Sequence, residues 1–165
     1  MLTQIQKQVV EVFRIALRCL CCESNEIINW TDEIISAHSN PPYDLIEISA
    51  GGTDIFSKLG KLPTNDDLNS SLRIVLGRMY ALASRDRQRL EDFASGLNQI
   101  ALESEQNLAE DLLFCNYIAD EYNLASTDIY GSLSDVQENF LELLKPYWSQ
   151  RSSETTWDLD HKICS

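Results

Sequence analysis

The sequence predicts an all-α protein, a single-domain bundle of about six to eight helices with no substantial sheet. Three observations favour this class. Apolar residues recur at intervals of three and four along most of the 165 residues, which is the spacing of amphipathic helices. Side chains that can cap a helix stand before several of these segments. The four prolines fall at segment boundaries, where a helix begins or ends.

The length and composition fit one globular domain. With 44% hydrophobic and 24% charged residues, the chain is long enough to bury a core. We place this domain at residues 1–148 and expect the polar residues 149–165 to form a loosely held tail. Charged residues interrupt the apolar stretch at residues 2–20, so it is read as neither a signal peptide nor a membrane span. These features predict a soluble, cytoplasmic protein without a membrane partner.

Two amphipathic helices are predicted at the start of the chain, at residues 2–22 and 26–38. In the first, an apolar stripe faces one way and charged residues occupy much of the other side. Either Ser24 or Asn25 is expected to cap the second helix. Both segments are therefore predicted to pack one face against a common core.

Two short segments follow the proline pair at positions 41 and 42. Proline suits the first turn of a helix because its missing N–H would be unpaired there anyway, so residues 43–48 are predicted to be helical. The alternation Ile46-Glu47-Ile48 leaves a short strand as the other possibility. A further short helix is expected at residues 53–59, before Gly60 and Pro63.

The clearest helix start in the chain is Thr64-Asn65-Asp66-Asp67. A capping side chain there precedes acidic residues, which favour the positive end of the helix dipole. This helix is expected to continue to about Ser84. We interpret the arginines along and after it as internal partners of the acidic residues downstream, with an external anion site as the alternative. They are Arg73, Arg78, Arg85, Arg87 and Arg89.

The stretch from Leu90 to Leu144 contains twelve acidic residues and no lysine or arginine. Apolar periodicity predicts helices at residues 88–101 and 108–122. Residues 126–131 are expected to form a loop or a single turn. Ser134-Asp135-Val136-Gln137 has the spacing of a capping box and is predicted to begin the last helix.

The segment 108–122 is predicted to have two distinct faces. One face combines apolar and aromatic residues, and the opposite face combines acidic residues with Tyr117. A helix of this kind either lies centrally in a bundle or presents one side to a partner. The first face consists of Leu108, Leu112, Cys115, Ala119 and Tyr122, and the second of Glu110, Tyr117 and Glu121 with Leu113 and Phe114 at its flanks.

One segment resembles part of a known class of protein. Asn-Pro-Pro-Tyr-Asp-Leu-Ile-Glu-Ile-Ser, at residues 40–49 directly after two helices, is similar to a segment of small helical immunity proteins from bacterial toxin systems of the contact-dependent growth inhibition type. Size, acidity and helical content agree with this class. The resemblance implies an acidic bacterial protein that blocks a toxin by direct contact, and it assigns no role to any individual residue.

No catalytic or cofactor-binding signature is present. The two histidines, His38 and His161, lie near no recognisable nucleophile motif. Cys19, Cys21 and Cys22 are interpreted as helix packing residues, with a metal or redox role as the alternative. We therefore expect no catalytic residue, no cofactor and no metal site.

The charge distribution points to the kind of partner. A net charge of −13 argues against binding nucleic acid, which requires clustered lysine and arginine, and favours a basic protein. Acidic residues interleaved with tyrosines suggest an inhibitory protein that neutralises a nuclease-type toxin. The alternatives are a regulatory or structural helical subunit and a small helical metal-dependent enzyme. The predicted partner-binding residues are Glu110, Asp111, Tyr117, Asp120, Glu121, Asp128 and Tyr130.

Overall fold

The computed structural model describes residues 1–104 and 107–152, and all regular structure in these ranges is helical. Eight α-helices and two 3-10 helices are present there, without any strand, which confirms the predicted all-α class. The elements are α1 (Gln4–Arg18), α2 (Ser24–Ala37), α3 (Tyr43–Ser49), α4 (Ile55–Gly60), α5 (Leu68–Ala83), α6 (Arg89–Glu103), η1 (Glu110–Asn116), α7 (Ile118–Ser126), α8 (Leu133–Leu144) and η2 (Lys145–Ser152).

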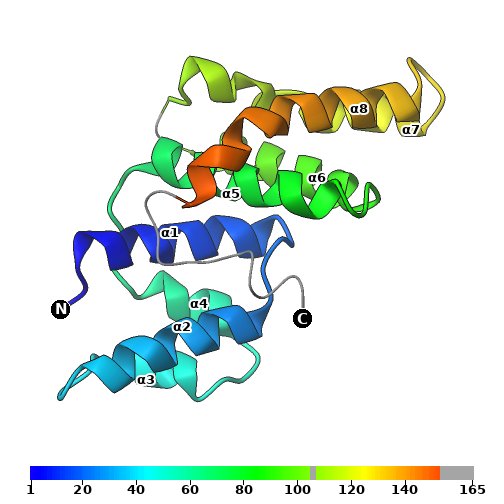
Figure 1. Cartoon of the computed structure of the whole chain (residues 1–165). Coiled ribbons are helices and arrows are strands. Elements are labelled where there is room, and N and C mark those ends of the chain that lie inside the picture. Colours follow the sequence, from blue (N-terminus) through cyan, green and yellow to red (C-terminus); the bar gives the residue numbers. More distant parts are fainter. Residues whose placement is uncertain (105–106, 153–165) are drawn as a thin grey trace.

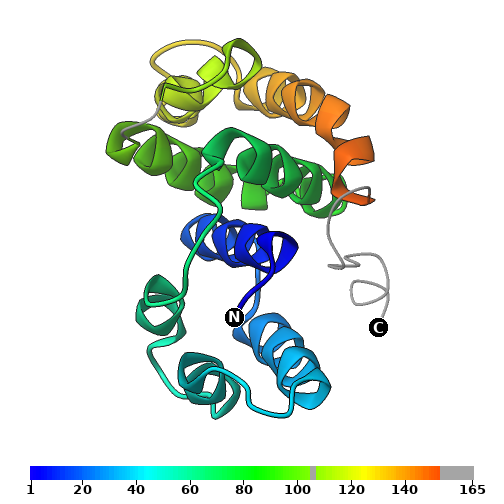
Figure 2. The same ribbon diagram turned by 90° about the vertical axis from the view of Figure 1, so that its left-hand side faces the viewer.

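Helix α1 lies in the middle of the molecule, between two groups of helices (Figure 1). On one side are α2, α3 and α4, and on the other are α5 and α6, with α7 and α8 beyond them. The view turned by 90° shows the same order (Figure 2). Because α1 contacts α4, α5 and α6, it joins the two groups through a shared core.

The central position of α1 explains its sequence. The helix is buried on most of its circumference rather than along one narrow stripe, as a helix between two layers must be. Phe13, which is fully buried, packs its ring edge-on against Trp30 of α2, with ring centroids 5.5 Å apart. This contact fastens the first group of helices to α1.

A glycine permits the close crossing of α1 and α6. A Cβ atom added at Gly96 would lie 2.7 Å from Cys19 Cα and 2.9 Å from the Arg18 carbonyl oxygen. Both of these are backbone atoms, which cannot move aside as a flexible side chain can. By helix propensity alone, a glycine at position 96 weakens its helix. In the structure it allows the backbone of α6 to approach the end of α1.

Several predicted element boundaries are confirmed. The helix predicted to start at Thr64-Asn65-Asp66-Asp67 is present as α5, but it begins at Leu68 and has no acidic residue in its first turn. Asp67 is itself the cap, and its carboxylate accepts a hydrogen bond from the Ser70 N–H at 3.0 Å. Residues 43–49 form helix α3, which settles the choice between helix and strand. Helix α4 begins after Asp54, close to the predicted segment.

Other boundaries differ from prediction. The segment predicted as one helix at 108–122 is a 3-10 helix followed by an α-helix, with the break at Tyr117. The predicted capping box at Ser134 is wrong, because α8 begins earlier, at Leu133. At the start of α2, the backbone N–H of Glu23 donates to Glu26 at 2.7 Å, so the cap precedes the predicted Ser24 or Asn25.

The C-terminal end of the described chain is helical. Helix η2 packs along α5 and continues past residue 148, where the predicted domain ends. Tyr147 at its centre is buried. Residues 153–165 of the predicted tail lie outside the described residues. Among the described helices, none combines the length and apolar character needed to cross a membrane.

Candidate functional site

The predicted partner-binding residues lie on three consecutive pieces of chain. Glu110 and Asp111 begin η1, Tyr117 joins η1 to α7, Asp120 and Glu121 lie in the first turn of α7, and Asp128 and Tyr130 lie in the turn before α8. These elements occupy the outer group of helices (Figure 1). Six of the seven residues are exposed, and Glu121 is half-buried. All seven residues therefore belong to the outer group of helices, with η1 and the turn before α8 toward its opposite ends (Figure 1).

Packing beneath this surface determines which side chains point outward. In η1, Leu112, Phe114 and Cys115 are buried. The Phe114 ring meets the Phe140 ring of α8 edge-on, with centroids 6.4 Å apart. Phe114 is therefore a core residue, although the sequence placed it beside the acidic face. Leu113, between the buried residues, is turned to solvent.

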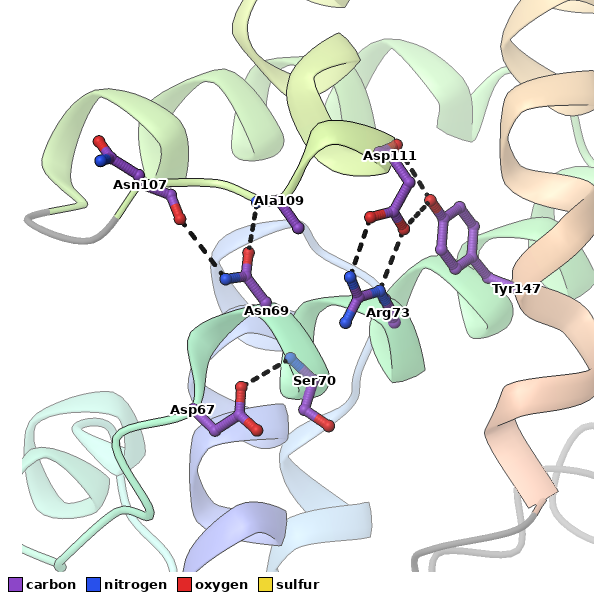
Figure 3. Close-up of polar contacts among 8 residues, drawn as sticks. All are labelled: Asp67, Asn69, Ser70, Arg73, Asn107, Ala109, Asp111 and Tyr147. Atoms are coloured by element: carbon purple, nitrogen blue, oxygen red, sulfur yellow. Dashed lines mark hydrogen bonds and ion pairs between the residues drawn. The ribbon is translucent and has the colours of Figure 1, made fainter.

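Asp111 differs from the other predicted contact residues because its carboxylate, although exposed, is held by hydrogen bonds from two other helices of the protein (Figure 3). Its carboxylate accepts hydrogen bonds from Arg73 Nε at 3.0 Å and Arg73 Nη2 at 2.9 Å. The Tyr147 hydroxyl donates to the same carboxylate at 2.7 Å and lies 3.0 Å from the Asp111 carbonyl oxygen. The hydrogen bonds from Arg73 lower the pKa of Asp111 to about 2, and the bond from Tyr147 acts in the same direction.

The pKa of Tyr147 moves the opposite way. Burial of the phenol is the main cause of its raised pKa, and the hydrogen bond to Asp111 adds to it. The phenol therefore stays protonated and serves as a donor. Arg73, Asp111 and Tyr147 together connect α5, η1 and η2. Asp111 thus positions η1, and its neighbours in the sequence remain available to a partner.

A second set of bonds fixes the chain just before η1. The side-chain oxygen of Asn69 accepts from the Ala109 N–H at 3.0 Å, and its amide nitrogen donates to the Asn107 carbonyl at 3.5 Å (Figure 3). Glu110 follows directly. Asn69 was not predicted to have a role, because its partners lie 38 and 40 positions further along the chain.

Arginines outside the acidic stretch neutralise part of it. Arg73 pairs with Asp111 at 2.9 Å, Arg87 with Glu138 at 2.8 Å, and Arg18 with Glu103 at 2.7 Å. The interpretation of the arginines as internal partners is thus confirmed for Arg73 and Arg87. Arg78 also pairs internally, but with Glu26 of α2, at 2.7 Å and buried.

Four predicted contact residues carry charge that these pairs leave uncompensated. In the part of the chain that the structure describes, none of the carboxylates of Glu110, Asp120, Glu121 and Asp128 forms an ion pair. We call these four residues the acidic face. Their charges are free to attract a cationic partner, with little internal screening.

Exposed apolar side chains accompany the acidic face. Tyr117 is 46% exposed and Tyr130 is 78% exposed. Tyr122, the third tyrosine of the stretch, is buried, and its hydroxyl accepts a hydrogen bond from Gln137 Nε2 at 2.9 Å. Tyr122 is therefore excluded as a surface anchor. Leu113, which the sequence placed beside the acidic residues, is exposed as well, and sequence reasoning missed three further exposed residues of this region: Leu124, Ile129 and Leu133.

The four cysteines that the structure describes are packed into the fold. Cys19, Cys21 and Cys115 are buried, and Cys22 is half-buried. Burial raises the pKa of Cys19 and of Cys115 to about 12, and it raises the pKa of Cys21 and Cys22 as well. Within the described residues no group of three or more histidine, cysteine or acidic side chains could hold a metal ion.

His38 has a structural partner: its Nδ1 lies 2.8 Å from the Ile34 carbonyl oxygen, so the ring N–H donates to the backbone. His161 lies outside the described residues.

A hollow of about 680 Å³ lies beside α1 and α4, and its cations are already engaged. Arg14 donates to the Gly60 carbonyl at 2.9 Å, and Lys61 pairs with Glu47 at 3.4 Å. Arg18 pairs with Glu103 and also lies over the Phe56 ring, 5.5 Å from its centroid. The contacts of Arg14 and Arg18 fasten α4 and α6 to α1, and that of Lys61 joins the end of α4 to α3.

Comparison with known proteins found no matching family model, curated protein or solved structure. The fold and the site define the class of protein: an all-α protein whose outer helices carry uncompensated carboxylates beside exposed aromatic and aliphatic side chains.

Proposed function

We propose that this protein binds and neutralises a basic protein partner, as an immunity protein that blocks a bacterial nuclease-type toxin by direct contact. The observation that carries the proposal is the acidic face beside exposed Tyr117 and Tyr130. An enzyme of this size would require a set of converging polar groups. A structural subunit would not require carboxylates gathered beside aromatic residues.

Electrostatics supports a role in association. A negative surface steers a positively charged partner and raises the association rate, and it discriminates against acidic competitors. Tyrosine is enriched where interfaces bind most tightly, because it buries a large rigid surface and keeps a polar end. Carboxylates can also occupy the positions of phosphates in a nuclease cleft, where they meet the same lysine and arginine side chains.

The test is charge reversal on the acidic face. The double variant Glu110→Lys and Glu121→Lys is expected to slow association with the partner at low salt, while the melting temperature changes little. The partner to use is a purified basic domain of a nuclease-type toxin, and the neighbouring genes are the first place to look for one. Stopped-flow measurement of the association rate at low and high salt reports the electrostatic contribution directly.

A matched control separates this face from overall charge. Glu33→Lys with Asp44→Lys makes the same change in net charge on α2 and α3, using one exposed and one half-buried residue, as in the test pair. The control should retain most of the wild-type association rate. Equal slowing by both double variants, or failure of the wild-type protein to bind the toxin domain, would contradict the proposal.

A further inference from the structure

An apolar tip stands at the end of the acidic face, where α7 turns into α8. Ile129 is 72% exposed and Tyr130 is 78% exposed, and they are adjacent in the chain. Leu124 of α7 and Leu133 of α8 are also exposed. We call these four residues the α7–α8 tip. In Figure 1 this turn extends past the ends of the neighbouring helices.

Backbone hydrogen bonds hold the tip in one shape. The Leu124 carbonyl accepts from the N–H of Ile129 at 3.1 Å and from that of Tyr130 at 3.2 Å. The Asp128 N–H donates to the Ala125 carbonyl at 3.3 Å, and Asp128 has φ +56°. This is the hydrogen-bond pattern of a Schellman helix end, with Asp128 in the left-handed position. The apolar side chains are therefore presented by a closed turn.

Carboxylates flank the tip on both sides. Asp120 lies four residues before Leu124 on exposed positions of α7, so the two share a helix face. Asp128 directly precedes Ile129, and Asp135 lies in the first turn of α8. Exposed apolar side chains next to uncompensated negative charge require a partner that supplies both an apolar contact and cations.

We infer that the α7–α8 tip is the apolar anchor of the interface, and that it enters an apolar depression rimmed by lysine and arginine on the partner. This inference rests on the proposed function and adds the chemistry of the partner's surface. A second copy of the chain is a poorer occupant, because each copy carries a net charge of −13. An anionic lipid surface is disfavoured for the same reason.

Two synthetic peptides test the anchor. The first is a fluorescein-labelled amphipathic helix of lysine and leucine, and the second has every leucine replaced by serine. Both carry the same positive charge, and only the first offers an apolar stripe. Fluorescence anisotropy should show that the wild-type protein binds the lysine–leucine peptide about tenfold more tightly than the lysine–serine peptide, because buried aromatic and aliphatic anchors dominate such contacts.

The chain provides a matched pair of variants. Ile129→Ser with Tyr130→Ser should abolish the tenfold preference and leave binding of the lysine–serine peptide unchanged. Ile46→Ser with Tyr43→Ser removes the same two residue types from α3, where they are 44% and 71% exposed, and should preserve the preference. Glu110→Lys with Glu121→Lys should weaken binding of both peptides.

The outcomes separate the two proposals. Equal affinity for the two peptides overturns the apolar anchor and leaves the acidic binding function in place. Failure to bind either peptide overturns both. Loss of the preference in the α3 control also overturns the anchor, since the effect would not belong to the tip. Two further results would also overturn the apolar anchor, because they assign the tip to another occupant. One is dimerisation in sedimentation that the Ile129→Ser, Tyr130→Ser variant loses. The other is binding to neutral phosphatidylcholine vesicles that the same variant loses.

Discussion

Tyr147 donates to Asp111 across 2.7 Å, on the carboxylate that Arg73 holds through two hydrogen bonds (Figure 3). This relationship joins η2, the last described helix, to the start of η1. The Asp111 side chain is 46% exposed, so its bonds are partly screened by solvent. Their main effect is geometric: they fix where η1 lies against α5.

Replacing Arg73 by glutamine should change the titration of Asp111. Without the guanidinium, we expect the pKa of Asp111 to rise from about 2 toward its ordinary value of 3.8. A carboxyl whose pKa is lower in the folded than in the unfolded protein stabilises the fold at pH values above its unfolded-state pKa. This contribution is lost as the pH falls toward the folded-state pKa of about 2. The wild-type protein should therefore lose more stability on acidification than Arg73→Gln does.

NMR titration of the Asp111 carboxyl and urea melts at several acidic pH values measure both effects. At neutral pH the variant should be less stable by roughly 0.5–1 kcal/mol, given the exposure of the pair. Arg87→Gln is the control, because it removes an exposed ion pair to Glu138 and leaves Asp111 untouched. An unchanged Asp111 titration in Arg73→Gln would show that the ion pair does not set this pKa.

Gly96→Ala should destabilise the protein by about 1–3 kcal/mol, the usual result of forcing an extra methyl group into close packing. The added Cβ would lie 2.7 Å from Cys19 Cα, so α1 and α6 must move apart. Chemical denaturation measures the change. Gly60→Ala is the comparison, because its Cβ would meet only the end of the Arg14 side chain, at 3.6 Å. Equal stability of the two variants would contradict the close crossing.

Local sequence patterns predicted much of the fold. Periodicity found the long helices, and the polar segment 64–67 located the start of α5 to within a few residues, because these signals act between residues at most four positions apart. The break between η1 and α7 escaped prediction. Apolar spacing continues through it, and the 3-10 geometry of η1 depends on packing against α6 and α8.

The candidate site was predictable in its location and less so in its details. A stretch without lysine or arginine marks where negative charge gathers. It does not show that Arg73, 38 positions earlier, engages Asp111. Helical spacing does place Tyr122 on the apolar face of its segment, and the structure buries it there. Ile129 falls in the segment predicted as a loop or a single turn, and that prediction does not say which way an apolar side chain in it points.

Leu20→Gly should stabilise the protein by roughly 1 kcal/mol, the cost of a left-handed backbone for a residue with a Cβ. Leu20 follows α1 with φ +55° and is 64% exposed, so little burial is lost. The Cys21 N–H donates to the Ala16 carbonyl at 3.0 Å, which closes the helix end around this residue. Thermal melts compare Leu20→Gly with Leu20→Ala. Alanine has a Cβ and therefore keeps the strain. Equal increases in melting temperature in the two variants would contradict this explanation.

The described cysteines should be unreactive in the folded protein. Thiol reagents attack the thiolate, and burial raises the pKa of Cys19 and Cys115 to about 12 and raises that of Cys21 and Cys22. A Cys164→Ser variant limits the measurement to these four. At about pH 8, a colorimetric thiol reagent should react slowly with the native variant and rapidly with all four thiols in guanidinium. Rapid reaction of any native thiol would instead support the redox alternative for the cysteines near the end of α1.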